Sequence, residues 1–504
     1  MHWTTSRFSL LRRVAPFLLS TGLSLAACSS EEDPVAPENL EGINAPDAGE
    51  SGASPGEESE GVGQEDPSVQ DDENAPPGPA AQLQPQSAQL ATGTGDASGQ
   101  YVATDREGNR VVAFIYDGAT TFQGTPLSYQ GQTGTYVALA RVGANGAVSW
   151  AKGFGAAEAG GGSSGNTSIN ALAVGPSGEI FIGGTLQGYD ETPAVLNLGG
   201  APLSAGTFLA KFSADGTHQW SRNTRPENGV EFIFTDFAAD PNGDVVALAS
   251  FGPTAAQAMV VRYRGGDGEP QWTRLYGPAN NPNSSVVGRS IAVDQNSRPY
   301  VVGAFTGTAS FGKATYTARV ITLDDGGLVA GAPFVIALSE GGEVRWSRRL
   351  AEHGEGLNVS TREGHLMVAL DRVASAKPFA SRGYLLSLDL SGRRRWEKAI
   401  GTFARAVHLG PYREVVVAGP GPAAELGVAE PAPDGSSAYV AKFNRVNGEL
   451  LKVAQIPAGL NDLSVGWTTG HVSAVGEFKG RIDLGTGPVQ SRGGSDGYLL
   501  QLSP

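Results

Sequence analysis

Cys28 is the only cysteine in the 504-residue chain, and the residues around it indicate what its thiol is for. Three arginines near the start of the chain are followed by an apolar stretch over residues 14–25. Leu25-Ala26-Ala27 then lead directly into the cysteine, and small residues of this kind are what a signal peptidase accepts. Without a second cysteine no intrachain disulfide can form.

This arrangement resembles the lipobox of bacterial lipoproteins, in which the cysteine is acylated and becomes the first residue of the mature chain. The resemblance implies a signal peptide over residues 1–27, recognised at Leu25, Ala26 and Ala27, and a covalent lipid on Cys28 that anchors the chain in a membrane. A transmembrane anchor is disfavoured because the apolar stretch has about twelve residues, whereas a bilayer span needs roughly twenty. A plain secretory signal is the other alternative, and it requires no cysteine at its cleavage site.

The residues after the cysteine bear on the location of the protein. Ser29 stands where an aspartate would be the familiar signal for retention in the inner membrane, so the outer membrane is the expected location. The acidic run over residues 29–33 is similar to one that accompanies surface export in some lipoproteins. The choice between the periplasmic and the outer face stays open.

The acidity of the chain is confined to one segment. The net charge is −15, but residues 29–100 contain sixteen Asp or Glu and no Lys or Arg, so the rest of the chain is close to neutral. Residues 28–80 are rich in Glu, Pro, Gly, Ser and Ala, a composition that predicts a disordered tether, although an unselected low-complexity tail is the alternative. No basic face accompanies an aromatic platform, so nucleic acid is not an expected partner.

Residues for metal or nucleophilic catalysis are sparse. The histidines after Cys28 are His218, His353, His365, His408 and His471, and no two of them have a spacing typical of zinc ligands. The oxygen-bearing residues Asp240, Asn242 and Asp244 alternate as calcium ligands do, but no downstream glutamate completes a calcium loop. The segment is also an ordinary hairpin turn, and we therefore expect neither calcium nor another cofactor.

A degenerate unit recurs seven times from about residue 100 to the end of the chain. Each unit has a polar turn followed by a β-branched stretch, which is typical of strands. These stretches are RVVAFI (110–115), IFIGGT (180–185), VVALAS (245–250), PYVVGAF (299–305), HLMVAL (365–370), EVVVAGP (414–420) and HVSAVGEF (471–478). A further strand is predicted in each unit at 135–142, 207–214, 258–265, 333–340, 383–390, 438–445 and 497–504.

Five of the units carry a tryptophan shortly after this last strand, namely Trp150, Trp220, Trp272, Trp346 and Trp396. A large flat ring at the same place in each repeat is better explained by packing between adjacent blades than by a ligand cage. Four strands in each of seven units predict an all-β, seven-bladed β-propeller over residues 81–504. Because the last unit stops before its fourth strand, we expect residues 82–92 to supply it beside 496–503.

The units resemble the bacterial family of seven-bladed propeller repeats, the SBBP-like repeats, found in exported proteins. The matching stretches are Gly178–Thr185 with Gly206–Trp220, Arg298–Phe305 and Asp496–Leu502. The resemblance implies a fold and an exported setting, and it implies no activity because the family shares no catalytic residues.

The sequence therefore favours a monomeric, non-enzymatic binding or scaffold module that is anchored by lipid and recognises a protein or a glycan. Propellers present variable loops on a rigid disc, and the inserts at 190–205, 313–331 and 421–436 are candidate contacts, although longer outer strands are the favoured explanation of them. The alternative is an exported enzyme acting on a polysaccharide or a small alcohol. Two carboxylates, or a histidine and a carboxylate, at one mouth of the central channel would favour that alternative.

Overall fold

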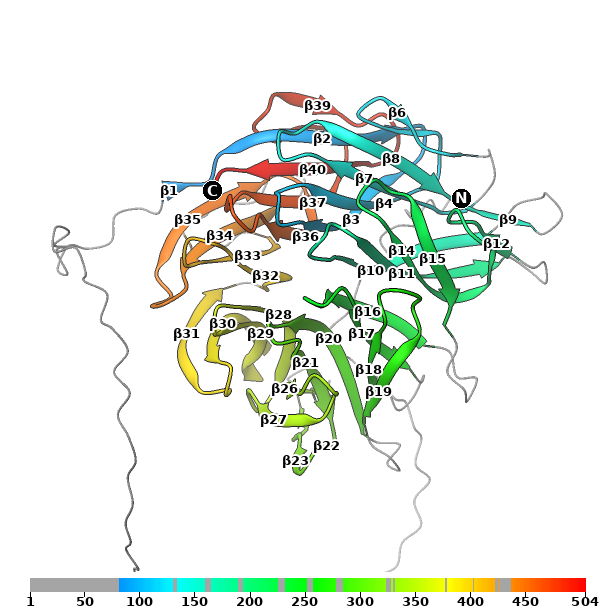
Figure 1. The fold of residues 1–504 in the computed structure, drawn as a ribbon. Coiled ribbons are helices and arrows are strands. Elements are labelled where there is room, and N and C mark those ends of the chain that lie inside the picture. Colours follow the sequence, from blue (N-terminus) through cyan, green and yellow to red (C-terminus); the bar gives the residue numbers. More distant parts are fainter. Residues whose placement is uncertain are drawn as a thin grey trace, which may run out of the picture. The chain divides into compact units, whose positions relative to one another are not determined.

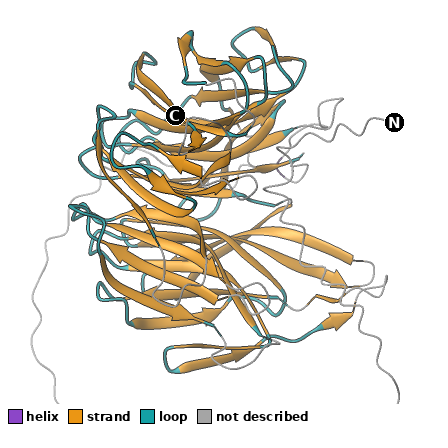
Figure 2. Cartoon of the chain, turned by 90° about the vertical axis from the view of Figure 1, so that its right-hand side faces the viewer, coloured by secondary structure: helices purple, strands orange, loops and turns teal. Residues whose placement is uncertain are grey.

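The computed structural model describes residues 81–504, except for 130–133, 159–164, 189–193, 225–231, 252–256, 278–283, 323–327, 330, 377–378, 402, 422–425 and 427–436. The expected signal peptide, Cys28 with its preceding Leu25, Ala26 and Ala27, and the tether over 28–80 lie outside the described residues. Most of the insert at 421–436 lies outside them as well. Figure 2 shows that the described part of the chain consists of strands and loops.

Seven four-stranded antiparallel sheets follow one another along the chain and form the blades of a propeller, as predicted. Blade one has β3 (Ala97–Thr104), β4 (Arg110–Tyr116), β7 (Tyr136–Val142) and β8 (Val148–Phe154). Blade two has β10 (Gly165–Val174), β11 (Ile180–Gly188), β14 (Gly206–Phe212) and β15 (His218–Asn223). Blade three has β16 (Phe232–Ala239), β17 (Val245–Phe251), β18 (Gln257–Tyr263) and β19 (Pro270–Tyr276). Blade four has β20 (Ser285–Val293), β21 (Pro299–Thr306), β26 (Ala332–Leu338) and β27 (Val344–Arg349).

The last three blades follow the same order. Blade five has β28 (Gly354–Arg362), β29 (His365–Ala376), β30 (Phe379–Asp389) and β31 (Arg394–Gly401). Blade six has β32 (Ala406–Leu409), β33 (Glu414–Pro420), β34 (Ala438–Asn444) and β35 (Leu450–Ile456), and β1 (Ala81–Gln82) is added in parallel to β35. Blade seven has β36 (Gly459–Val465), β37 (Val472–Phe478), β40 (Asp496–Leu502) and β2 (Pro85–Gly93).

The N-terminal strand β2 completes the blade that the C-terminus leaves unfinished. It runs antiparallel to β40, with partners from Pro85 and Leu502 to Ala91 and Gly497, and the two strands lie side by side in Figure 1. The segment 82–92 is divided between two blades, since Gln82 lies opposite Val453 of blade six. The ring is therefore closed by strands from both ends of the described chain, because β2 supplies the fourth strand of the last blade.

The pattern of burial explains why the middle strands are the clearest in the sequence. The second and third strands of each blade are covered on both faces by neighbouring blades, and β4, β26 and β40 are buried at every position. Such strands read as continuous apolar runs. The fourth strands lie at the rim, and β19 alternates between exposed and covered side chains.

In the described part of the chain, eleven further short strands lie in the connections between the main strands of the blades. They are β5 (Thr120–Phe122), β6 (Thr125–Pro126), β9 (Ala156–Glu158), β12 (Ala194–Leu196), β13 (Leu203–Ser204), β22 (Thr308–Phe311), β23 (Ala314–Thr317), β24 (Ile321–Thr322), β25 (Leu328–Val329), β38 (Arg481–Asp483) and β39 (Pro488–Gln490). The insert at 190–205 contributes β12 and β13 to a small sheet with β9, and the insert at 313–331 contributes β23, β24 and β25. The described residues contain no helix that is long and apolar enough to cross a bilayer.

Each repeat tryptophan fastens its blade to the next one. The indole Nε1 of each donates a hydrogen bond of 2.8–3.0 Å to a carbonyl after the third strand of the following blade, and the pairs are Trp150 with Ala214, Trp220 with Gly265, Trp272 with Glu340, Trp346 with Leu390 and Trp396 with Arg445. The ring also covers a glycine of that same turn. These glycines, Gly216, Gly268, Gly342, Gly392 and Gly448, have positive φ, and a Cβ at any of them would lie within 3.0 Å of the indole.

Blade six lacks the tryptophan but keeps the hydrogen bond. Lys452 is paired with Lys442 across β34 and β35, as Trp220 is paired with Lys211 in blade two. Its Nζ donates to the carbonyl of Pro504 over 2.7 Å, so a lysine links blade six to the end of blade seven. The recurring feature is therefore a donor on the fourth strand that reaches the next blade.

Candidate functional site

The innermost strand of six blades contains a β-bulge. The register shifts at Gln100 in β3, Asn170 in β10, Thr235 in β16, Arg289 in β20, Leu357 in β28 and Asn461 in β36. A bulge leaves one residue unpaired and turns its side chain in a new direction. Four of these residues, Thr235, Arg289, Leu357 and Asn461, line the central cavity.

The residue after the bulge links neighbouring inner strands in four places. Each of these residues accepts a hydrogen bond from a backbone N–H of the next blade, and the pairs are Asp236 with Ile291 (2.9 Å), Ser290 with Val359 (3.3 Å), Asn358 with Val407 (3.0 Å) and Asp462 with Val102 (3.0 Å). The last pair joins blade seven to blade one. Sequence reasoning missed these bridges, although a polar residue at one position of several first strands is a signal that could have found them.

The seven inner strands enclose a cavity of about 720 Å³, which is the channel of the propeller. Its lining combines polar side chains with a few aromatic ones, as in small-molecule binding sites. Glu355 and Phe403 lie where inner strands begin, with Arg289 and Asp371 beside Glu355, and Trp467 lies at the opposite end, after the inner strand of blade seven. We call this opposite end the Trp467 mouth.

Two carboxyl groups face each other at the first of these ends. Glu355 lies directly opposite Asp371 in the register of β28 and β29, and the guanidinium of Arg289 forms an ion pair with Glu355. The pKa of Asp371 is raised to about 7, chiefly by burial and to a smaller extent by the charge of Glu355, while a backbone hydrogen bond from Arg372 lowers it. The Oδ1 atom of Asp371 is buried and has no hydrogen-bond partner among the described residues. Asp371 thus keeps its proton up to a higher pH than an ordinary aspartate does.

The histidines are spread over the ring. His218 lies in blade two, His365 in blade five and His471 in blade seven, and only His408 of blade six lines the channel within the described residues. Burial lowers the pKa of His408 to about 4, so its imidazole is neutral at pH 7. In the described ranges no three His, Cys, Asp or Glu side chains are grouped closely enough to hold a metal ion.

The turn at Asp240, Asn242 and Asp244 has its oxygen atoms directed at donors of the protein. The guanidinium of Arg262 pairs with Asp240, which also accepts from the backbone N–H of Asn242 over 2.7 Å. Asp244 accepts from the backbone N–H of Gly265 over 2.8 Å and from Nε2 of Gln271 over 2.7 Å. The buried guanidinium of Arg262 therefore pairs with Asp240, one of the residues that the sequence pattern gave as a candidate calcium ligand.

The Trp467 mouth is a hollow of about 240 Å³ lined mainly by the turns that follow the innermost strands. Four carboxylates belong to this lining, and each is paired with an arginine outside it. The pairs are Asp105 with Arg141 (2.6 Å), Asp240 with Arg262, Asp294 with Arg298 (2.7 Å) and Glu363 with Arg445 (2.7 Å). The acidic groups of the lining are thus neutralised before any ligand arrives.

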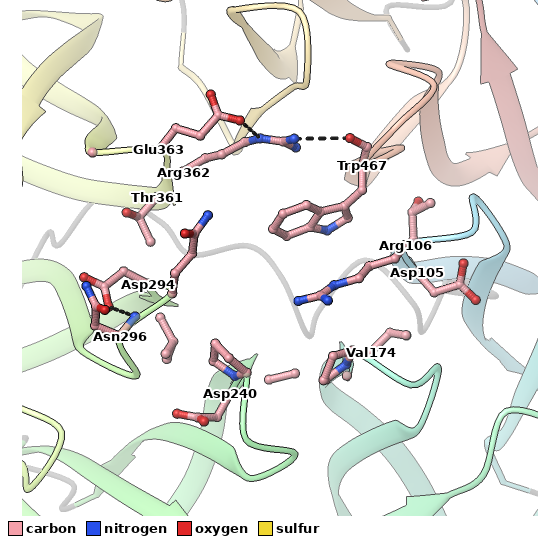
Figure 3. Close-up of a pocket in the computed structure, with 18 of the residues that line it drawn as sticks. Asp105, Arg106, Val174, Asp240, Asp294, Asn296, Thr361, Arg362, Glu363 and Trp467 are labelled. Carbon is pink, nitrogen blue, oxygen red and sulfur yellow. Dashed lines mark hydrogen bonds and ion pairs between the residues drawn. The ribbon is translucent and has the colours of Figure 1, made fainter. Parts of the chain in front are cut away.

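Two further arginines of the lining are arranged around one indole. The guanidinium carbon of Arg362 lies 4.6 Å from the ring centroid of Trp467, and that of Arg106 lies 5.9 Å from it. Arg362 also donates to the carbonyl of Trp467 over 3.2 Å. Arg106 is exposed and makes no ion pair or hydrogen bond with the described residues. Figure 3 shows that the side chain of Arg106 and the indole of Trp467 both extend into the hollow.

Sequence reasoning did not single out Trp467 or Arg106. Trp467 interrupts the regular series of tryptophans, since it lies in the turn between the first and second strands of blade seven and not on a fourth strand. It is also 40% exposed, whereas the repeat tryptophans are half-buried. Its position outside the repeat is the feature of the sequence that could have marked Trp467 as a candidate site residue.

Comparison with known proteins identifies the repeat and no close relative. Residues 271–304 match the family model of a beta-propeller repeat, SBBP, and no curated protein sequence matches the chain. Among solved structures, BamB from Moraxella catarrhalis is similar at 11% identity with a TM-score of 0.39, over 84% of this chain and 100% of that one. A quinohemoprotein alcohol dehydrogenase from Pseudomonas putida HK5 is similar at 11% identity with a TM-score of 0.38, over 81% and 76% of the two chains.

Asp371 makes the stability of the propeller depend on pH. Its folded-state pKa of about 7 lies above the value of roughly 3.9 in an unfolded chain, so the folded state binds the proton more tightly between these values. The protonated carboxyl group contributes its full stabilisation of the folded state below about pH 4. This contribution is lost as the pH rises to about 7, and the free energy of unfolding falls by about 3 kcal/mol after allowance for partial exposure. Urea unfolding at pH 4 and pH 8 measures this loss.

The substitution Asp371→Asn should remove most of that loss, because the amide does not titrate. Glu340→Gln is the matched control, since Glu340 is exposed and its side chain has no ion pair among the described residues. An identical pH dependence in wild type and Asp371→Asn would contradict the assignment.

Proposed function

We propose that this protein is a lipid-anchored, non-enzymatic binding module of the bacterial cell envelope, and that the Trp467 mouth holds its protein or glycan partner. The covalent lipid is on Cys28, and the outer membrane is the proposed location. Three observations support anchoring by lipid, namely the sole cysteine, the basic and apolar stretch before it, and the acidic low-complexity segment after it.

One observation carries the assignment of the site. The carboxylates of the hollow are neutralised by arginines, whereas Arg106 projects into it without a partner among the described residues, beside a partly exposed indole. A charged group and an exposed aromatic ring on a rigid concave surface are what a ligand recognises. Six blades contribute to the lining, so the ligand would contact the propeller and not a single loop.

A second candidate function is an exported enzyme acting on a polysaccharide or a small alcohol. Glu355 and Asp371 favour it, because two carboxyl groups face each other in one cavity and burial raises the pKa of Asp371 to about 7, as a catalytic acid requires. Product analysis separates the two functions. An enzyme of this kind releases new reducing ends from a polysaccharide, whereas a binding module returns the polymer unchanged.

The anchor is tested by Cys28→Ala. Wild-type protein should carry the added mass of its acyl chains and partition into the detergent phase, whereas the variant should lack that mass. Mass spectrometry of the purified chain and detergent partition measure both properties. Ser29→Ala is the control, since it leaves the acceptor thiol in place. Equal masses and equal partition in wild type and Cys28→Ala would contradict lipidation.

The binding site is tested with full-length protein immobilised in detergent and offered, separately, the polysaccharide and the protein fraction of the producing cell's envelope. Wild type should retain one fraction, and Trp467→Ala should weaken that retention about tenfold through loss of the ring and of its contacts with the arginines. Leu275→Ala, at an exposed position on β19, should bind like wild type. Undiminished retention by Trp467→Ala would show that the mouth is not the site.

A further inference from the structure

We propose that the Trp467 mouth recognises a carboxylate carried on a sugar ring, so that the partner is an acidic, uronate-type glycan. This inference rests on the proposed function and names the ligand class of the same site. It follows from the charge of the hollow, from the contacts that its arginines make, and from the polar groups that surround them.

The charge of the hollow favours an anion. Asp105, Asp240 and Asp294 are each committed to one arginine that is outside the lining, and Glu363 is shared by Arg445 and Arg362. After these pairs are formed, Arg106 keeps a full positive charge with no carboxylate assigned to it among the described residues. An incoming carboxylate would supply that missing partner.

Two guanidinium groups contact the indole of Trp467. Arg362 is fixed by its contact with the ring, by its hydrogen bond to the carbonyl of Trp467 and by Glu363. Arg106 contacts the same ring at a larger distance and extends farther into the hollow. The planar guanidinium of Arg106, exposed beside this ring, can donate two parallel N–H groups to one carboxylate.

The rest of the lining suits a hydroxylated ring better than a bare anion. Gln295 and Asn296 are exposed in the turn between β20 and β21, and Thr361 lies at the end of β28. Amides and hydroxyls both donate and accept, as sugar hydroxyls require. The partly exposed indole offers an apolar surface beside them. The hollow also adjoins the channel, since Thr361, Arg362 and Trp467 line both, so a glycan chain could continue inward from the bound ring.

An acidic peptide is the competing occupant. It would match the charge of Arg106 but would leave the amides and the indole edge without a hydroxylated ring. A peptide laid across the face would also reach turns outside the hollow, where Arg393 is 81% exposed. The two occupants therefore differ in which arginines they use.

The experiment is calorimetry on the full-length lipidated protein in detergent. The probes are a galacturonic acid hexamer, the same hexamer with its carboxyl groups reduced to alcohols, and a glutamate hexamer. The uronate hexamer should bind, and the reduced and peptide probes should bind at least about tenfold more weakly. Arg106→Ala should weaken uronate binding by at least about tenfold, since a charge-assisted pair is lost.

Two further variants keep the result interpretable. Arg106→Lys should restore only part of the affinity, because an ammonium cannot form the bidentate pair. Arg393→Ala lies on the same face outside the hollow and should bind the uronate like wild type. Circular dichroism of each variant confirms that the propeller is folded.

The outcomes distinguish this inference from the proposed function. If the reduced hexamer binds as well as the uronate and Arg106→Ala has no effect, the inference is overturned while a glycan-binding mouth stands. If only the glutamate hexamer binds, and Arg106→Ala weakens it, the mouth is a protein site and the glycan assignment is wrong. If no probe depends on Arg106 or Trp467, both the inference and the proposed site are wrong.

Discussion

The closure of the ring by β2 against β40 is the interaction on which the rest of the structure depends. A propeller stacks each blade only on its two neighbours, so one unfinished blade would leave an edge and a gap. The described chain avoids this by pairing its first long strand with its last one, and Asp462 of blade seven then reaches the backbone of Val102 in blade one. Trp467 and Arg106 of the Trp467 mouth lie on either side of this junction, since Trp467 belongs to blade seven and Arg106 to blade one.

Two sets of hydrogen bonds connect neighbouring blades, one at the rim of the propeller and one near its axis. At the rim, indole donors reach the turns of the next blade over glycines that have no Cβ to obstruct them. At the axis, side chains after the bulges accept from the backbone of the next inner strand. Inner strands of adjacent blades are not paired in one sheet, so these polar bridges satisfy backbone groups that would otherwise face the channel unpaired. The bulges thereby both connect the blades and set which side chains enter the cavity.

The sequence predicted the fold well because its strongest signals are local. The apolar runs of the middle strands and the spacing of Trp150, Trp220 and the other repeat tryptophans follow from burial between blades. The candidate site could not be predicted in the same way. Arg106 and Trp467 are 361 positions apart and meet only because the ring closes, and Glu355 faces Asp371 only through the register of one hairpin. The periodic pattern of apolar residues in the sequence does not indicate which turns lie together at one end of the channel.

Hydroxyl-radical footprinting of the full-length protein, with and without saturating uronate hexamer, tests the central claim most directly. Trp467 is 40% exposed at the mouth, Phe403 is 45% exposed at the other end of the channel, and Leu275 is 53% exposed on an outer strand. The account predicts that the ligand slows oxidation of Trp467 and leaves Phe403 and Leu275 unchanged. Protection of Phe403 or Leu275 with no change at Trp467 would contradict it.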